Sequence, residues 1–146
     1  MDYLSSSLEE TRALGARIAV HVRPGDLLAL IGDLGAGKTE FVRGFVDALS
    51  PGAPVRSPTF TLLNVYETPV LPVYHFDFYR LCDPGELVEI GLDDYLEGSG
   101  VCLIEWADLF MGKLPAQNRH EVRFADTGLT SRRVQVSSRL AARMGC

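Results

Sequence analysis

The sequence has few of the features that mark secreted, membrane-bound or metal-clustered proteins. It contains three cysteines, Cys82, Cys102 and Cys146, and this odd number without metal-ligand spacing argues against a disulfide framework and predicts reduced thiols. No apolar run approaches the roughly 20 residues that are needed to cross a bilayer. The first ten residues lack the basic start and apolar stretch of a secretory signal. We therefore expect a cytoplasmic protein that does not contact a membrane.

The chain also lacks an excess of positively charged residues. The 146 residues carry a formal net charge of -5, which disfavours tight nucleic-acid binding by the chain on its own. Basic residues are concentrated in the C-terminal stretch, which we interpret as a solvated strand and tail; they are Arg132, Arg133, Arg139 and Arg143. No repeat, low-complexity tract or long linker interrupts the chain, so we expect one domain over residues 1–146.

The hydrophobic pattern predicts an α/β fold. A capping box at Ser7 and an apolar stripe predict a helix over residues 8–22. The unbroken apolar run at residues 27–31 predicts a strand buried on both faces, and residues 38–49 have the periodicity of a helix.

The pattern after residue 60 predicts more strands than helices. β-Branched and aromatic residues predict a strand pair over residues 60–66 and 70–78. Asp83 and Pro84 predict the start of a helix that Gly91 can stop. Further strands are expected at residues 101–104 and near 121–124 and 133–136. This order predicts an α/β, P-loop NTPase-like sheet, parallel with an antiparallel portion and flanked by helices.

Residues 32–39 match the phosphate-loop pattern G-x-x-x-x-G-K-S/T without deviation. Glycines allow backbone N–H groups to surround phosphate oxygens, and the loop opens a helix whose positive dipole end faces the same phosphates. Lys38 can reach the β- and γ-phosphates, and the Thr39 hydroxyl can ligate Mg²⁺. A chance match would occur in about 1 of 100 chains of this size, and the position between a strand and a helix favours nucleotide binding.

Two acidic residues are candidates for the magnesium side of such a site. Glu105 ends the apolar run VCLIE and is the first choice for holding Mg²⁺, the alternative being a surface carboxylate just past a strand. Asp77 lies among aromatic residues, where an acid needs a metal, a water or Arg80 as its partner, and a purely structural pair with Arg80 stays open. His75 is interpreted as a packed strand residue.

Two neighbouring features have a structural and a functional interpretation. Residues 57–59, Ser-Pro-Thr, could reach the γ-phosphate as a switch or could form an ordinary proline turn. Trp106 follows Glu105 directly, and we expect it to be a core anchor.

Several segments together resemble one family, the tRNA threonylcarbamoyladenosine biosynthesis ATPases called TsaE or YjeE. These segments are GDLGAGKTEFVRG (32–44), SPTFTL (57–62), YHFDFYRL (74–81), DPGEL with GLDDY (83–87 and 91–95) and LIEW (103–106). The phosphate-loop pattern alone is unspecific, whereas the combination with HFD-x-YRL and IEW is much more specific. The resemblance covers about two-thirds of the chain, and residues after Pro115 match only loosely.

The resemblance implies a Mg²⁺-dependent ATPase that acts with the proteins TsaD and TsaB to form N6-threonylcarbamoyladenosine at position 37 of tRNA, touching tRNA only through that complex. It implies phosphate contacts from residues 35–40, which are Gly35, Ala36, Gly37, Lys38, Thr39 and Glu40. Thr39 and Glu105 would hold Mg²⁺, Lys38 and Asp77 would serve hydrolysis, and residues 57–61 would be switch-like. Glu40 departs from the family, which often has a threonine there, so only its backbone N–H is carried over.

Other nucleotide-dependent functions fit the residues less well. A small-molecule kinase is the main alternative, although no arginine-bearing lid segment is evident in the sequence. A second alternative is a nucleotide-dependent binding module with negligible turnover. No N-K-x-D sequence for reading guanine is present, which disfavours a GTPase.

Overall fold

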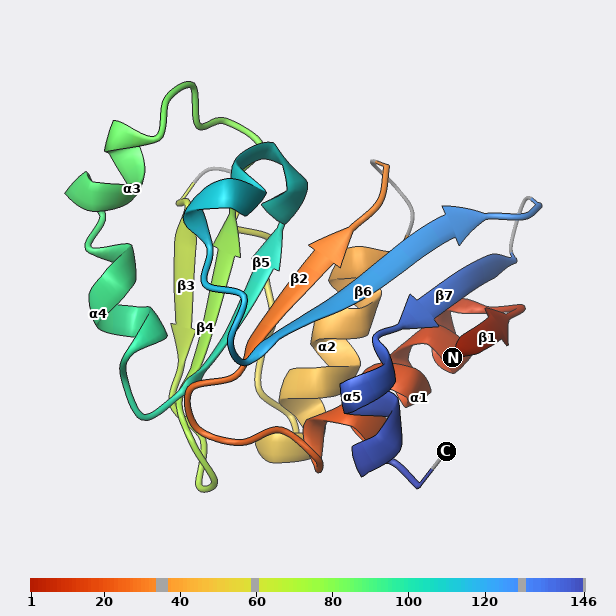
Figure 1. Cartoon of the computed structure of the whole chain (residues 1–146). Coiled ribbons are helices and arrows are strands. Elements are labelled where there is room, and N and C mark those ends of the chain that lie inside the picture. The colour runs from red at the N-terminus through yellow and green to blue at the C-terminus, as the bar shows by residue number, and fades with distance from the viewer. Residues whose placement is uncertain (34–36, 59–60, 129–130, 146) are drawn as a thin grey trace.

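The computed structural model describes residues 1–33, 37–58, 61–128 and 131–145 (Figure 1). Within these residues there are seven strands: β1 (Asp2–Ser5), β2 (Leu27–Ile31), β3 (Leu63–Tyr66), β4 (Val73–Asp77), β5 (Val101–Glu105), β6 (Arg119–Asp126) and β7 (Arg132–Val136). The helical elements are α1 (Leu8–Ala19), α2 (Lys38–Leu49), α3 (Gly85–Glu89), α4 (Leu92–Leu96), the 3-10 helix η1 (Ala107–Lys113) and α5 (Ser138–Arg143).

All seven strands belong to one mixed sheet in the order β1-β7-β6-β2-β5-β4-β3. The central strands β6, β2, β5 and β4 are mutually parallel, whereas β1, β7 and β3 pair antiparallel at the two sides. The carboxyl ends of the parallel strands therefore meet at one edge, the upper edge in Figure 1. The predicted parallel sheet with an antiparallel portion and flanking helices is confirmed.

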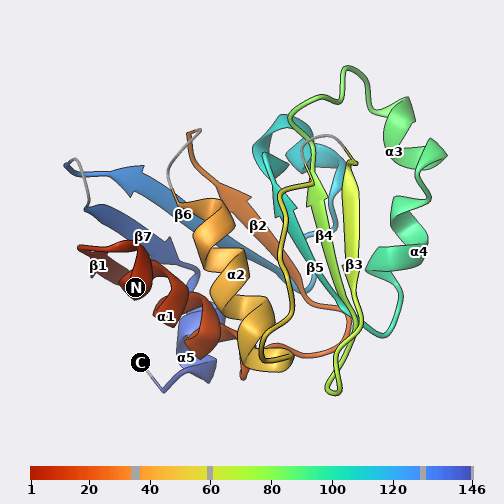
Figure 2. The same ribbon diagram turned by 180° about the vertical axis from the view of Figure 1, so that it is seen from behind.

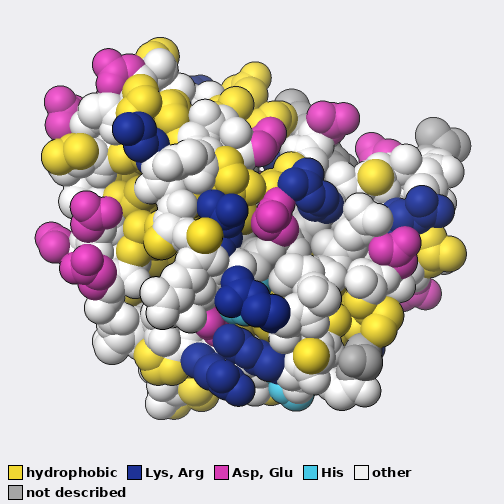
Figure 3. Space-filling view, in the orientation of Figure 1, with side chains coloured by type: hydrophobic (Ala, Val, Ile, Leu, Met, Phe, Trp, Pro, Cys, Tyr) yellow, Lys and Arg dark blue, Asp and Glu magenta, His cyan; other side chains and the backbone are white. Residues whose placement is uncertain are grey.

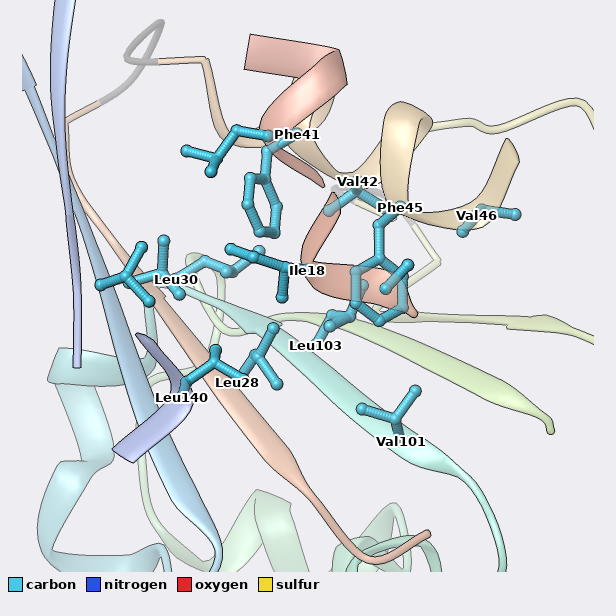
Figure 4. Close-up of a cluster of buried hydrophobic side chains, with 14 of the residues drawn as sticks. Ile18, Leu28, Leu30, Phe41, Val42, Phe45, Val46, Val101, Leu103 and Leu140 are labelled. Atoms are coloured by element: carbon cyan, nitrogen blue, oxygen red, sulfur yellow. The ribbon is translucent and has the colours of Figure 1, made fainter. Parts of the chain in front are cut away.

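Helices α1 and α2 cover one face of the sheet, with α5 beside them (Figure 2). Their apolar side chains pack onto the central strands, and Figure 4 shows Phe41 and Phe45 of α2 pointing toward Leu28 and Leu103. The two helices cross closely at two glycines. A Cβ on Gly44 would overlap the backbone carbonyl of Arg12 on α1, so only glycine fits at this contact.

The opposite face of the sheet has a second apolar cluster. Phe76, Phe78 and Ile104 lie in it, and η1, α3 and α4 contribute residues that cover it. In Figure 3 acidic side chains gather along the left edge of the molecule, over α3 and α4. No helix among the described residues is long and apolar enough to span a bilayer.

The predicted elements are largely present, with shorter ends. Helix α1 ends at Ala19 instead of residue 22, and the predicted strand pair is the antiparallel pair β3–β4. The helix expected after Asp83 is α3, and it ends before Gly91 as predicted, where Gly91 adopts a left-handed conformation with φ 71°. Strand β1, α4, η1 and α5 were not predicted. Phe60, the predicted first residue of β3, lies outside the described residues.

Candidate functional site

A cleft of about 200 Å³ lies where the carboxyl ends of β4 and β5 meet the start of α2. It brings together most of the residues singled out in the sequence. Its lining consists of Leu8, Gly37, Lys38, Thr39, Glu40, Ser57, Asp77, Glu105, Trp106 and Arg132.

The start of α2 forms one wall of the cleft. Gly37 caps the helix in the left-handed conformation, with φ 97°, and a Cβ there would approach Arg132 Nε within 2.7 Å. The unpaired N–H groups and the positive dipole end of α2 are therefore at the cleft, where they suit an anion. Lys38 and Thr39 are the first two residues of this helix. Gly35 and Ala36, which were expected to contact phosphate, lie outside the described residues.

Lys38 is buried beside the acidic wall of the cleft. Its Nζ donates a hydrogen bond to the carbonyl of Gly32 at 2.6 Å and lies 3.9 Å from the centre of the Trp106 ring. Burial lowers the pKa of Lys38, while attraction by Glu105 and Asp77 acts in the opposite direction. The lysine is thus held between a backbone carbonyl and an aromatic face.

The two candidate acids lie side by side at the ends of neighbouring strands. Asp77 of β4 and Glu105 of β5 are register partners, and only 5% and 4% of their surfaces are exposed. Asp77 Oδ1 accepts a hydrogen bond from the N–H of Tyr79 at 2.9 Å. The alternative of Glu105 as a surface carboxylate is wrong, because strand pairing on both sides of β5 buries its last residue.

His75 is a packed strand residue, as the sequence analysis concluded, but it also contacts the site. Its ring is fully buried on β4, two residues before Asp77, so both side chains point to the same face of the sheet. His75 Nε2 lies 2.6 Å from Glu105 Oε2. Sequence spacing did not reveal this pair, which depends on the parallel register of β4 and β5.

Glu40 and Ser57 lie at the rim of the cleft. The Glu40 carboxylate accepts a hydrogen bond from Arg12 Nε at 2.6 Å, so its side chain is bound to α1. This arrangement leaves the backbone N–H of Glu40 as the group expected to contact phosphate. Ser57 lines the cleft. Thr59, the central residue of the suspected switch, lies outside the described residues.

Three lining residues were missed or misjudged from the sequence. Trp106 packs against the second apolar cluster as expected, but it is only partly buried, and its ring also faces Lys38 and lies tilted beside Tyr79 at 5.0 Å, a cleft position that the sequence did not indicate. The solvated role expected for Arg132 is wrong, because its side chain is 11% exposed and lines the cleft. Arg132 lies two residues before the buried Val134 on β7 and therefore on the same face of the strand, which was the available signal. Leu8 carried no signal beyond its place at the start of α1.

Two of the other C-terminal arginines make structural contacts, whereas Arg133 is exposed as expected. Arg143 Nη1 donates to Asp26 Oδ2 at 2.6 Å, and Arg139 Nη2 donates to the carbonyl of Arg119 at 2.9 Å. Together these contacts hold α5 against the ends of β2 and β6. Leu140 and Ala141 of α5 are buried in the core, which the expectation of a solvated tail did not include, while Arg139 remains exposed as expected.

Among the described residues no group of three or more His, Cys, Asp and Glu side chains is arranged to hold a metal ion alone. Mg²⁺ is usually bound by one or two carboxylates together with phosphate oxygens and waters, which fits two acids next to a phosphate site. A larger hollow of about 820 Å³ lies between α1, α2 and residues 53–56. None of the candidate residues Lys38, Asp77 and Glu105 lines it.

The model of the family "Threonylcarbamoyl adenosine biosynthesis protein TsaE" matches residues 5–134. The chain belongs to the TsaE family. The Bacillus subtilis TsaE is 50% identical over 109 residues, which are 75% of this chain and 68% of that protein. The Haemophilus influenzae TsaE is 42% identical over 98 residues, 67% of this chain and 62% of that protein. The family suggested by the sequence motifs is thereby confirmed.

A solved structure shows the same fold as this TsaE-family chain. The crystal structure of Bacillus subtilis YdiB superposes with a TM-score of 0.84 at 35% identity, covering 99% of this chain and 93% of that one. The agreement extends over the antiparallel strands and α5, which lie beyond the motif segments. The family name places the chain in threonylcarbamoyladenosine biosynthesis.

Proposed function

We propose that this TsaE-family chain is a Mg²⁺-dependent ATPase that supports formation of N6-threonylcarbamoyladenosine at position 37 of tRNA. The observation that carries the proposal is the convergence of Lys38, Thr39, Asp77 and Glu105 on one cleft at the start of α2. Each residue type has a task in phosphoryl transfer. A cytoplasmic location, where tRNA is modified, is part of the proposal.

Binding of the phosphates would use the start of α2. The helix N-terminus and the ammonium of Lys38 supply positive charge, and a bound phosphate would take over the hydrogen bond that Lys38 now gives to Gly32. Arg132 adds a second cation to the same cleft. The phosphates of ATP are thus the part of the nucleotide that the described cleft suits best.

The acids fit a magnesium ion that accompanies the nucleotide. The Thr39 hydroxyl and the Glu105 carboxylate would hold Mg²⁺ directly or through water, and the ion would neutralise charge on the phosphates. Asp77, the register partner of Glu105, would orient or deprotonate the attacking water. Two carboxylates with different hydrogen-bond partners, His75 for Glu105 and the Tyr79 N–H for Asp77, support a division of roles.

The partner proteins proposed are TsaD and TsaB, with tRNA reached only through their complex. The net charge of -5 favours contact with proteins over direct contact with a polyanion. Hydrolysis in the cleft would be coupled to these partners through segments at its rim, among which Ser57 is described.

The test is release of ADP and inorganic phosphate from Mg-ATP without any acceptor, with TsaD and TsaB added at rising concentration. We expect slow release by the chain alone and stimulation by the partners, with no release by Lys38→Met. Modification of tRNA is measured in the same reconstituted reaction. ADP that forms only when a metabolite acceptor is present would favour a kinase. Absence of ADP at every partner concentration would reduce the chain to a binding module.

A further inference from the structure

The buried ring of His75 contacts Glu105, an acid of the candidate site. Packing in the core alone does not require this contact. His75 is fully buried on the central strand β4, and its Nε2 contacts Glu105 Oε2 at 2.6 Å. An ionised carboxylate accepts hydrogen bonds, so the tautomer with a proton on Nε2 donates to Glu105. His75 Nδ1 has no hydrogen-bond partner among the described residues, so the contact with Glu105 is the one polar contact of the ring in that part of the chain.

The pair fixes the side chain of Glu105. Glu105 is the last residue of β5 and is 4% exposed, so its carboxylate has little access to water. The hydrogen bond engages one carboxylate oxygen, and the same residue lines the cleft beside Lys38 and Asp77. A glutamate has three side-chain torsions, and a bond from a buried ring removes much of that freedom.

We propose that His75 is a positioning residue for Glu105: it holds one carboxylate oxygen and thereby keeps the carboxylate oriented for a magnesium ion bound with nucleotide. The inference rests on the proposed function, because it assigns His75 a task within that site. His75 does not touch the reacting groups. Groups that orient a metal-binding side chain typically alter metal affinity by about 10-fold to 100-fold when they are removed.

Two substitutions at position 75, to glutamine and to asparagine, test the bond, because their side chains differ in length by one methylene. The amide nitrogen of glutamine can take the place of a histidine Nε2, whereas the shorter asparagine reaches only the place of Nδ1. His75→Gln should therefore keep the bond to Glu105, and His75→Asn should lose it. Both variants put a similar polar amide into the core, so differences in burial largely cancel.

A second buried histidine provides the control. His120 is 1% exposed, and its Nε2 lies 3.3 Å from Asp26 Oδ1. Asp26 directly precedes β2, so this pair lies at the end of β2 that is opposite the cleft. His120→Asn perturbs the same kind of pair without touching the candidate site.

The experiment measures the dissociation constant of a non-hydrolysable ATP analogue in excess EDTA and in excess Mg²⁺, for the wild type and the three variants. The ratio of the two constants reports the contribution of the metal, and thermal melts report folding. We expect His75→Asn to reduce the ratio by about 10-fold or more, with the affinity in EDTA nearly unchanged, and His75→Gln and His120→Asn to keep the wild-type ratio.

Two results would overturn the inference. One is a wild-type ratio in His75→Asn, and the other is an equal loss in His75→Gln and His75→Asn, which would show that the core and not the bond matters. If His75→Asn does not fold, the ratio of His75→Gln alone decides: a wild-type value supports the inference, and a reduced one contradicts it. A wild type that binds no nucleotide would instead contradict the proposed function.

Discussion

The Nζ atom of Lys38 lies 3.9 Å from the centre of the Trp106 ring, so the cation is held against an aromatic face in the cleft. Such a contact contributes about 0.5–2 kcal/mol, depending on how far the cation is shielded from water. A phosphate in the cleft would draw the ammonium away from the ring. Trp106 therefore reports on the position of Lys38.

The first prediction uses the fact that Trp106 is the one tryptophan of the sequence. Its emission should change on addition of Mg-ATP and should saturate, because phosphate binding moves the lysine off the ring. The measurement is a fluorescence titration with ATP. In Lys38→Met, which keeps the length of the side chain without its charge, the signal should stay flat. A wild-type emission that ATP leaves unaltered, although calorimetry shows binding, would contradict this.

The second prediction separates the two acids. Asp77→Asn should still bind Mg-ATP and should lower the rate of hydrolysis by about 100-fold, as expected for the loss of a general base. Glu105→Gln should instead weaken the dependence of ATP binding on Mg²⁺. The measurements are single-turnover hydrolysis and Mg²⁺ titrations of both variants. If Asp77→Asn alone removes the response to Mg²⁺, the two roles are assigned the wrong way round.

The third prediction concerns the crossing of α1 and α2. Gly44→Ala should lower the free energy of unfolding by about 3 kcal/mol, because the new methyl group overlaps the backbone of Arg12 and the helices must move apart. Urea denaturation measures the loss. Gly112→Ala is the matched control, since a Cβ there has no atom within 4 Å. Equal stabilities for the two variants would show that the helices adjust without cost.

The fourth prediction concerns His120 and the pH dependence of stability. Burial lowers the pKa of His120, although Asp26 attracts the charged form. The unfolded chain, with a histidine pKa near the usual ~6.5, therefore binds the proton more readily than the folded chain. The stability that His120 contributes is present above that value and is lost as the pH falls from it toward the lower folded pKa.

His120→Gln removes the titrating group and keeps a donor for Asp26. We expect the free energy of unfolding to fall less steeply between about pH 7 and pH 5 in this variant than in the wild type. Urea denaturation at a series of pH values provides the comparison. A variant with the same slope as the wild type would show that other groups cause the dependence.

The sequence predicted the parts of the site that depend on local pattern. The run at residues 27–31, the glycine loop and the helix at residues 38–49 lie together along the chain, so their arrangement follows from strand–turn–helix chemistry. Glu105 and Asp77 were found because each ends a strand. In parallel strands those ends meet at one edge.

The remaining site residues depend on long-range register, which a single sequence does not reveal. The contact of His75 with Glu105 follows from the register of β4 against β5. Arg132 reaches the cleft because β7 pairs with β6, which lies next to β2. The position of Trp106 in the cleft was missed because the residue has φ 59°, a conformation rare in bulky residues that turns the chain into η1. Gly91 ends α3 as the sequence predicted, but the short helix α4 that begins directly after it was not predicted.

The strand order also determines when this protein can fold during synthesis. The central strand β2 has β5 and β6 as neighbours, and both are translated long after it. A ribosome that has made the glycine loop has not yet made Asp77 or Glu105, so a nascent chain cannot form the cleft before residue 105 has emerged. Pairings of such high contact order form slowly, and β2 stays without neighbours in the meantime.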